Sequence, residues 1–412
     1  MRKPFSIAFI VRDPLPPIRA DLLTLFGAEM PRYGLQTELV GQSGSGAAFA
    51  CASTSAWQAG GMHPVGSLAS RFASVMSPLW DLAGLLRARR RGRLACIQVR
   101  DKIASGLLGR IAAGLLGVPF VYWMSFPIVE GFEVRRDEIG RRKRGLAWLA
   151  HAARAAASRF VIYRLVLPGA RHIFVQSSAM ADWLAAKGFA RERLTPVPMG
   201  VDADLFERSR IAPSTDPRLD GRRVVLYLGR IAQSRKSDFL LDVADLLRRD
   251  LPDLLLVIAG DAPSNDEMAW MRAEIARRGL DGHVLLTGWL PQEAALGYAV
   301  RAEVGLSPIP RGTLFDVSSP TKLVEYLALG IPSVANDIPD QALVIEASGA
   351  GLCVPMEAAP FAAGVRRLLI DPHLAAGFAA RGPGWVRAHR TYAILGKDVA
   401  AAYARILPEH AA

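Results

Sequence analysis

Cysteine and histidine are scarce in this chain of 412 residues, and their scarcity limits its chemistry. The three cysteines, Cys51, Cys96 and Cys353, lie far apart and form no C-x-x-C pair. This pattern argues against a disulfide framework or a cysteine zinc site, and it fits a reducing compartment. The seven histidines show no H-E-x-x-H spacing, so we expect no dedicated metal site.

Two nucleotide-binding signatures are also missing. The chain has neither G-x-x-x-x-G-K-[ST] nor G-x-G-x-x-G, which disfavours a P-loop nucleotidase and a dinucleotide-dependent oxidoreductase.

Long uninterrupted apolar runs are lacking as well. An uncharged stretch, 111–129, is long enough to suggest a membrane span, but Gly117 and Pro119 interrupt it, so we expect a helix, a turn and a buried strand. The opening residues MRKPFSIAFIVRD have the charge pattern of a signal peptide. Their apolar run is short and is followed at once by Arg12 and Asp13, so we expect a buried first strand.

What the sequence does contain is alternation between short apolar runs and helical patterns. About half of the residues (51%) are apolar, and the length suggests two or three domains, each with its own core. Runs that are apolar throughout, with helices between them, predict parallel sheets covered on both faces, and therefore an α/β fold of two doubly wound domains. The predicted strands are FSIAFIV, LACIQV, PFVYWM and HIFVQS in the first half, and RVVLYLGR, LLLVIAGD, HVLLTG, VGLSPI and PSVAND in the second.

A segment rich in Pro, Ser, Asp and Arg, 208–222, looks like a linker between the domains. It would separate an N-terminal domain, 1–207, from a C-terminal domain, 223–385. The helical pattern of 386–412 could pack back on the N-terminal domain. We expect the domains to face a central cleft, with ligands outside the carboxyl ends of the strands.

The stretch SSPTKLVEYLALGIPSVAND predicts a helix that begins as an anion site. Pro320 suits the first helical turn, and Ser318 or Ser319 suits the N-cap. The backbone N–H groups that follow would be unpaired, and a lysine adds a full positive charge there. The phosphate of a sugar phosphate would bind these N–H groups and the lysine, and a glutamate one turn later would reach the neutral hydroxyls of the sugar. The alternative is an ordinary amphipathic surface helix. The residues of the predicted anion site are Thr321, Lys322, Leu323 and Glu325.

A second cationic site follows the predicted strand VVLYL. Gly229 would let the backbone turn tightly, and Arg230 and Lys236 would then lie at the carboxyl end of that strand. A guanidinium fork and a point charge together match a diphosphate.

Taken together, these motifs resemble the retaining glycosyltransferases of family 4, which have the GT-B fold. The resemblance extends through LYLGR with Lys236, LLLVIAGD, HVLLTGWLP, PTKLVEYLALGIPSVAND and AGLCV. It also includes IFVQSSAMADWLAAKG and LTPVPMGVDADLF, where that family's first domain ends.

The resemblance implies a role for each matching residue. Arg230 and Lys236 would hold the donor diphosphate, and Glu325 would bind the ribose hydroxyls. The N–H groups of 321–323 would cap a phosphate, and Leu290 would lie against the base. It further implies attack by an acceptor hydroxyl on the same face as the leaving group, with no metal and no cofactor besides the UDP- or GDP-sugar donor.

The chain departs from the family pattern in both halves. Where the family often carries a glutamate, eight residues before Glu325, this chain has Val317, with Asp316 beside it. Two alternatives follow: Asp316 substitutes through a shifted backbone, or the donor sugar is held differently. The first half lacks the family's Gly-Gly loop and has Ser125 where a histidine is common. By position alone, the acceptor-side candidates are Arg19, Asp101 and Ser125.

Positive charge is concentrated in one segment. The net charge is +12, and 135–171 holds ten Lys or Arg against two acidic residues. Within it, an apolar stripe and a basic face share one predicted helix, which could lie on an anionic membrane. A core-packed helix with a solvated basic face is the alternative; we expect no nucleic-acid binding, because no recognised motif is present. The membrane cluster would be Arg141, Arg142, Lys143 and Arg144, and the stripe Leu146, Leu149, Ala153, Ala156 and Phe160.

We therefore expect a cytoplasmic glycosyltransferase, peripherally associated with the inner face of the membrane. Its acceptor would be a saccharide or a polyprenyl-linked glycan in cell-surface or exopolysaccharide biosynthesis. The alternatives are another GT-B enzyme, such as a nucleotide-sugar epimerase or a phosphorylase, or a catalytically weak nucleotide-sugar-binding partner of another transferase.

Overall fold

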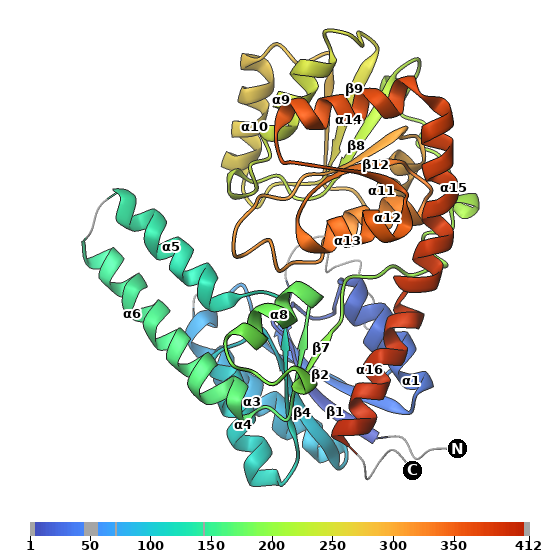
Figure 1. Cartoon of the computed structure of the whole chain (residues 1–412). Helices are drawn as coiled ribbons and strands as arrows, with labels where there is room; N and C mark the ends of the chain where they lie inside the picture. Colours follow the sequence, from blue (N-terminus) through green and yellow to red (C-terminus); the bar gives the residue numbers. More distant parts are fainter. Residues whose placement is uncertain (1–4, 45–56, 71, 143–144, 408–412) are drawn as a thin grey trace. The chain divides into compact units, whose positions relative to one another are not determined.

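The computed structural model describes residues 5–44, 57–70, 72–142 and 145–407. It divides the chain into two compact units (Figure 1). The first contains Met1–Pro198 together with Tyr392–Ala412, and the second contains Met199–Thr391. Each unit is built on a parallel β-sheet with helices, so the predicted fold class of two doubly wound α/β domains is confirmed.

The first unit contains, within the described residues, a seven-stranded parallel sheet in the order β3-β2-β1-β4-β5-β6-β7. The chain moves from β1 outward to β3 and then returns to place β4 on the other side of β1, as in a dinucleotide-binding fold. The strands are β1 (Phe5–Ile10), β2 (Leu35–Ser43), β3 (Met62–Ser67), β4 (Leu94–Arg100), β5 (Phe120–Met124), β6 (His172–Val175) and β7 (Leu194–Pro196).

Helices cover both faces of this sheet. On one face, α3 and α4 contact each other; on the other, η1 contacts α16, the helix that follows the second unit. Buried residues of α16, including Leu395, Val399 and Tyr403, share one hydrophobic core with Phe9 and Phe26. The helices are η1 (Asp21–Glu29), α1 (Met30–Arg32), α3 (Ala73–Arg91), α4 (Ala104–Leu116), α5 (Ile128–Arg142), α6 (Leu146–Phe160), η3 (Val161–Val166), α7 (Leu167–Gly169), α8 (Ser178–Ala186), η4 (Arg191–Arg193) and α16 (Tyr392–Ile406).

The second unit contains a six-stranded parallel sheet among its described residues, in the order β10-β9-β8-β11-β12-β13. The strands are β8 (Arg223–Leu228), β9 (Leu254–Ala259), β10 (Val284–Gly288), β11 (Val304–Ser307), β12 (Ser333–Asn336) and β13 (Gly351–Val354). The helices are η5 (Arg208–Arg210), η6 (Pro217–Leu219), η7 (Gln233–Arg235), α9 (Phe239–Leu247), α10 (Asn265–Arg277), α11 (Gln292–Val300), α12 (Thr321–Ala328), α13 (Pro339–Ser348), α14 (Ala358–Ile370) and α15 (Pro372–His389).

The two units meet in the sequence at Pro198 and Met199, earlier than the expected linker 208–222. That segment is packed into the second unit. The Arg208 guanidinium donates to the carbonyl oxygens of Leu329 (3.0 Å) and Val300 (2.7 Å). The charged composition of the segment therefore reflects hydrogen bonds to helix ends rather than a solvated connection.

The uncharged stretch 111–129 forms a helix end, a turn and a strand, as predicted. The helix α4 ends at Leu116, Gly117 adopts a left-handed conformation (φ 66°), and β5 begins at Phe120. In the described part of the chain, no helix combines the length and apolar character that a membrane span requires.

The basic segment forms a hairpin of two helices, α5 and α6, which extends from the sheet of the first unit (Figure 1). The predicted apolar stripe of α6 is exposed, whereas Ala155 and Ser158 are the buried positions. Leu146 is 86% exposed and Phe160 58%. The core-packed alternative for this helix is therefore wrong. Lys143 and Arg144 lie outside the described residues, as do the side chains of Arg141 and Arg142.

Candidate functional site

The carboxyl edge of the second sheet has a natural crevice between β8 and β11. The chain leaves β8 toward β9 on one side, and β11 is the neighbour on the other. The loops after β8 and β11 therefore diverge, and open α/β sheets bind ligands at such a switch point. Both predicted cationic motifs lie here, one after each strand.

The loop after β8 begins with a close backbone approach. The Gly229 N–H donates to the carbonyl of Ala259 (3.0 Å), and Gly229 has a φ of 152°. A Cβ at Gly260, after β9, would lie 2.0 Å from the Gly229 carbonyl oxygen. Two glycines are thus required for the loops after these strands to touch.

Two predicted cations follow this turn with free side chains. Arg230 and Lys236 are exposed, and neither side chain has a hydrogen bond or an ion pair with any described residue. Lys236 has a φ of 51°, an uncommon conformation for a residue other than glycine. Arg235 beside it is also exposed and unpaired with the described residues, and its charge acts on Lys322. Sequence reasoning missed Arg235, although it lies in the same loop.

The helix α12 after β11 starts one residue later than expected. Pro320 is the N-cap and no side chain caps the helix, so the predicted serine N-cap is wrong. Thr321, Lys322 and Leu323 are the first three residues of the helix, and their N–H groups have no acceptor within it. The predicted backbone anion site therefore remains available.

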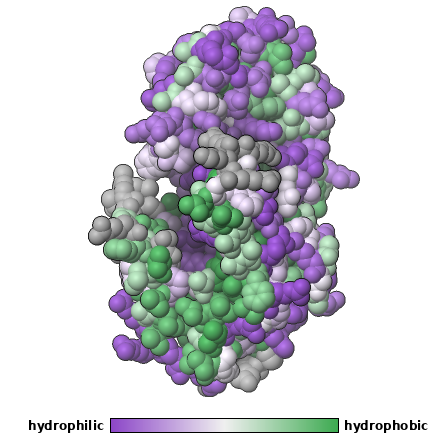
Figure 2. Space-filling model, turned by 90° about the vertical axis from the view of Figure 1, so that its left-hand side faces the viewer, coloured by the Kyte–Doolittle hydropathy of each residue, from purple (hydrophilic) through white to green (hydrophobic). Residues whose placement is uncertain are grey.

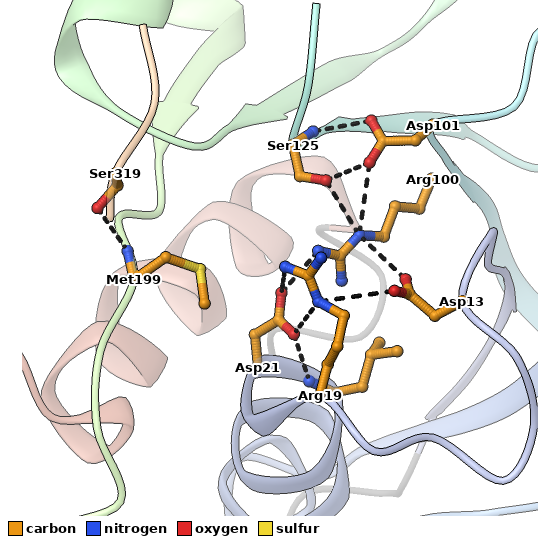
Figure 3. A network of polar contacts seen from close by, with 9 residues as sticks. Asp13, Arg19, Asp21, Arg100, Asp101, Ser125, Met199 and Ser319 are labelled. Carbon is orange, nitrogen blue, oxygen red and sulfur yellow. Dashed lines mark hydrogen bonds and ion pairs between the residues drawn. The ribbon is translucent and has the colours of Figure 1, made fainter. Parts of the chain in front are cut away.

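The two serines are occupied by the structure around them. Ser318 Oγ donates to the Phe315 carbonyl (2.6 Å). Ser319 is 2% exposed; its hydroxyl accepts from the Met199 N–H (2.9 Å; Figure 3) and donates to Asp340 (2.7 Å). Asp340 also accepts from Arg390 (2.7 Å), so Ser319 lies in a buried network within the second unit.

Lys322 and Glu325 are the most unusual ionisable groups of this crevice. Lys322 is 8% exposed, and its ammonium lies 5.0 Å from the centre of the Tyr227 ring. Neither Lys322 nor Glu325 forms a hydrogen bond or an ion pair through its side chain with any residue that the structure describes.

Burial moves the pKa of both groups. It lowers the pKa of Lys322 to about 7, helped by the charge of Arg235 and opposed by Glu325. Burial also raises the pKa of Glu325 to about 7, against the effect of Lys322. Perturbed values of this kind, at a topological switch point, mark a candidate functional site.

Tyr326 fixes α12 against the end of β8. Its hydroxyl accepts from the Leu228 N–H (2.7 Å). Its ring packs against Gly305, where a Cβ would lie only 2.5 Å from the ring and would clash with it. The Lys322 Cε atom in turn lies 3.3 Å from the position of a Cβ at Gly229. The lysine and the glycine turn are therefore held side by side.

The remaining residues predicted to bind the donor are engaged in other contacts of the second unit. Asp316 accepts from Arg311 Nε (2.8 Å) and from the Gly312 N–H (3.2 Å), so its carboxylate is engaged within its own loop. Val317 is buried. Leu290 follows β10 and is partly buried against the core of the second unit.

The first unit has its own polar network at the corresponding switch point, between β1 and β4 (Figure 3). Two of the three predicted acceptor-side residues pair directly: the Ser125 N–H donates to Asp101 (2.9 Å), and their side chains are also bonded. Arg19 binds Asp21 (3.1 Å).

Three residues that sequence reasoning missed connect these groups. Arg100 donates to Asp21 (2.7 Å) and to Ser125 (3.4 Å). Asp13 lies 3.6 Å from Arg19 and 3.7 Å from Arg100. A signal was present, because Asp13 and Arg100 stand at the ends of the apolar runs of β1 and β4.

Electrostatics within this network differ between its carboxylates. Burial alone would raise the pKa of Asp21, but Arg100 and Arg19 outweigh it and the pKa is lowered. Burial dominates at Asp101 and raises its pKa. The Arg100 Nη1 atom is buried and has no partner among the described residues. The network therefore offers both carboxylate acceptors and guanidinium donors, a set that suits hydroxyl groups.

Metal ligands are not gathered at either site. No group of three or more His, Cys, Asp or Glu side chains in the described ranges has the arrangement to hold a metal ion.

Comparison with known families agrees with this architecture. Residues 222–371 match the model described as glycosyl transferases group 1, and residues 24–200 match a glycosyl transferase 4-like domain. The two parallel-sheet units and the two matches define the class as a GT-B protein. The chain belongs to the group 1 glycosyltransferases.

Individual relatives match over part of their length. The chain is 32% identical to the alpha-D-kanosaminyltransferase of Streptomyces kanamyceticus over 157 residues, which cover 38% of this chain and 39% of that protein. It is 29% identical to the GDP-mannose-dependent alpha-(1-6)-phosphatidylinositol monomannoside mannosyltransferase of Mycolicibacterium smegmatis, over 47% of this chain and 51% of the other. The chain thus spans about two fifths of the first relative and half of the second.

Among solved structures, Anabaena HepE in complex with UDP and glucose superposes with a TM-score of 0.69. The superposition covers 96% of this chain and 99% of HepE, at 15% identity. At this identity the likeness demonstrates the shared fold.

Proposed function

We propose that this protein transfers a sugar, with retention of configuration, from a nucleoside diphosphate to a hydroxyl group of an acceptor. The observation that carries the proposal is the second unit's crevice. Arg230 and Lys236, in the loop after β8, have side chains without a partner among the described residues, and so has Lys322 in α12 after the neighbouring strand β11. The first three backbone N–H groups of α12 also have no acceptor within the helix.

The chemistry follows from this charge. When the bond between the anomeric carbon and the diphosphate oxygen breaks, its electron pair stays on the leaving diphosphate. Fixed cations and helix N–H groups stabilise this developing charge more than they stabilise the intact donor. The acceptor oxygen bonds to the anomeric carbon on the same face, and its proton goes to an oxygen of the departing diphosphate. These protein cations neutralise the phosphates, so the proposed reaction needs no metal ion.

UDP and GDP are the proposed carriers. Glu325 lies one turn beyond the phosphate-binding end of α12, where a carboxylate accepts hydrogen bonds from ribose hydroxyls, and Leu290 would contact the base. Support comes from the relatives, since one is described as GDP-mannose-dependent and HepE was solved with UDP and glucose.

The acceptor is proposed to be a saccharide, free or linked to a polyprenyl lipid, at the inner face of the membrane. Asp13, Arg19 and Asp101 of the first unit would bind its hydroxyl groups. The exposed apolar stripe of α6 supports membrane association. A role in cell-surface or exopolysaccharide synthesis is part of the same proposal.

A nucleotide-sugar-binding partner without strong activity is the second candidate, and the buried Val317 favours it. Thermal stabilisation by UDP and by GDP would identify the base. Isotope-labelled donor with membrane extract would then separate the two functions: the transferase labels a product, whereas the partner binds donor without turnover.

A chelator tests the phosphate site in the same assay. EDTA should leave labelling nearly intact, since the positive charge belongs to the protein. Complete loss, restored by Mg²⁺ or Mn²⁺, would mean that the crevice does not work as proposed.

A further inference from the structure

A pocket of about 660 Å³ opens in the first unit, at the amino ends of β5 and β6. Phe120 and His172, the first residues of these strands, line it together with the end of α4 and the last turn of α16. The proposed acceptor network lies at the carboxyl ends of β1 and β4, the opposite edge of the same sheet. The pocket is therefore separate from that network.

Four arginines line this pocket, Arg110, Arg171, Arg193 and Arg405. None of them forms an ion pair with a carboxylate of the described chain. The single acidic lining residue is Glu192, which is exposed. Four positive charges against one negative charge repel one another, and a bound anion would relieve this repulsion.

Two of the guanidinium groups are held in place by backbone carbonyls. Arg193 Nη2 donates to the carbonyl oxygens of Leu167 and Pro168, both at 3.1 Å, and to that of Ala170. Arg110 Nη1 donates to the carbonyl of Leu165. The other guanidinium nitrogens of both have no acceptor among the residues described. Arginine carries five N–H donors in a planar fork, so oriented donors remain for phosphate oxygens.

The remaining lining is apolar, and its rim is exposed. Val118, Phe120 and Ile406 line the pocket. Leu115 and Leu116 follow directly after the lining residue Gly114, and they are 83% and 42% exposed. Figure 2 shows hydrophobic residues gathered over the side of the first unit where α3, α4 and α6 lie in Figure 1. Cations beside an exposed apolar surface match an amphiphile better than an inorganic ion.

We propose that this pocket binds the phosphate group of a membrane lipid, with Leu115 and Leu116 against its hydrocarbon chain. His172 adds no charge there at neutral pH, because burial and the charges of Arg405 and Arg193 lower its pKa to about 4. The site goes beyond the proposed transfer, since it uses neither the donor crevice nor the acceptor network.

Calorimetry with decyl phosphate and with inorganic phosphate tests this assignment. Decyl phosphate should bind the wild-type chain, and inorganic phosphate should bind at least about tenfold more weakly. The double variant Arg171→Gln/Arg405→Gln should lose about tenfold or more of the decyl phosphate affinity, because it removes two charged donors. Both side chains are exposed, so the fold should be retained, as an unchanged unfolding temperature would verify.

A matched control removes two exposed, unpaired arginines of the second unit, as Arg272→Gln/Arg387→Gln. It should bind decyl phosphate like the wild type. The variant Leu115→Ser/Leu116→Ser should weaken decyl phosphate binding and leave inorganic phosphate binding unchanged.

Vesicles distinguish a lipid headgroup from a free phosphate ester. Phosphatidylcholine vesicles containing phosphatidic acid should retain the wild type more strongly than the pocket variant. Equal retention of both, an equal loss in the control, or inorganic phosphate binding as tightly as decyl phosphate would overturn the proposal.

Discussion

The pKa of Lys322 and that of Glu325 both lie at about 7, because loss of solvent outweighs their mutual attraction and neither side chain has a hydrogen bond or an ion pair with a described residue. A lysine with a lowered pKa carries its charge below about pH 7 and loses it above. A bound diphosphate favours the charged form, so it should raise this pKa and take up a proton when it binds at higher pH.

Nucleotide affinity should therefore fall as pH rises from 7 to 9. The fall is at most about tenfold per pH unit, the limit for one proton. Calorimetry of UDP and GDP in two buffers with different ionisation enthalpies measures the proton uptake directly. Lys322→Met should abolish this dependence, and Glu325→Gln should retain it. A wild-type affinity that is flat over this range would show that Lys322 does not contact the phosphates.

The exposed cations of the same crevice give a second expectation at the residue scale. Arg230→Ala and Lys236→Ala should each reduce kcat/KM by the equivalent of about 2–4 kcal/mol, the effect of losing one preorganised charged donor. Folding should be unaffected, because both side chains are exposed.

Arg249→Ala is a matched control, since Arg249 is an exposed arginine of the same unit that pairs with Asp245 instead. It should turn over donor like the wild type. Normal turnover in either test variant would show that the diphosphate lies elsewhere.

Individual residues were predictable where local rules suffice. The predicted anion site at 321–323 and the predicted loop cations depend on where a helix begins and a strand ends, and both can be predicted from residues that are adjacent in the sequence. Ser319, a predicted N-cap beside the donor anion site, has partners that are distant in sequence and could not be predicted: Met199, Asp340 and Arg390 come together only in the folded chain. Arg235 and Arg100 also lie at or just after the end of a predicted strand, but neither belongs to a motif that would have marked it as a site residue.

Among the elements, α6 departs most from an ordinary surface helix. Its stripe of Leu146, Leu149 and Phe160 is exposed, while Arg154 stacks over the Phe132 ring of α5 at 4.3 Å. The two helices of the hairpin thus pair with each other and leave the apolar stripe uncovered by any described residue. Such a helix gains free energy by entering a membrane interface.

Replacing Arg141, Arg142, Lys143 and Arg144 with glutamine should release the protein from anionic vesicles at about 0.1 M salt, because each charge contributes roughly 1 kcal/mol near such a surface. Leu146→Ser/Leu149→Ser should weaken binding at all salt concentrations. Co-sedimentation measures both effects. A control that converts Arg87, Arg89, Arg90 and Arg93 to glutamine loses the same charge elsewhere in the first unit; if it releases equally, net charge alone is responsible.

All nine predicted strands are present, and the described residues contain four others that were missed. The missed strands are short or polar: β7 has three residues and β13 four. In β2, Glu38 is buried because it binds His63 of β3 (2.6 Å). A carboxylate interrupts the apolar pattern by which a buried strand is predicted. The partner that allows Glu38 to be buried is His63, which lies on β3, a strand whose sequence is also polar.

At the scale of the whole molecule, the sequence predicted two units but misplaced their boundary. The segment 208–222 is polar partly because Arg208 and Arg222 bind carbonyls of the second unit, which only the structure reveals. The first unit in turn depends on α16, whose buried Tyr392, Leu395, Val399, Tyr403 and Ile406 complete its core.

A chain that ends at Thr391 should therefore lose the stability of its first unit selectively. Each buried side chain of this size contributes about 1.5–3 kcal/mol, and their sum approaches the total stability of a typical domain. Hydrogen exchange should show fast exchange throughout β1–β7 and unchanged protection in β8–β13. A chain that ends at Leu407 keeps every one of these contacts and should be protected like the full chain. Equal protection of the first unit in both would mean that α16 is dispensable.

Because the first unit needs α16, its folding can be completed only late in the synthesis of the chain. When β1–β7 have left the ribosome, α16, which completes the cover of one face of their sheet beside η1, has not yet been translated. The second unit is continuous in sequence and can fold as soon as Thr391 emerges, before the first is complete. An exposed apolar face would persist on the nascent chain for the time needed to make almost two hundred more residues, which makes the first unit the expected client of chaperones that act on the ribosome.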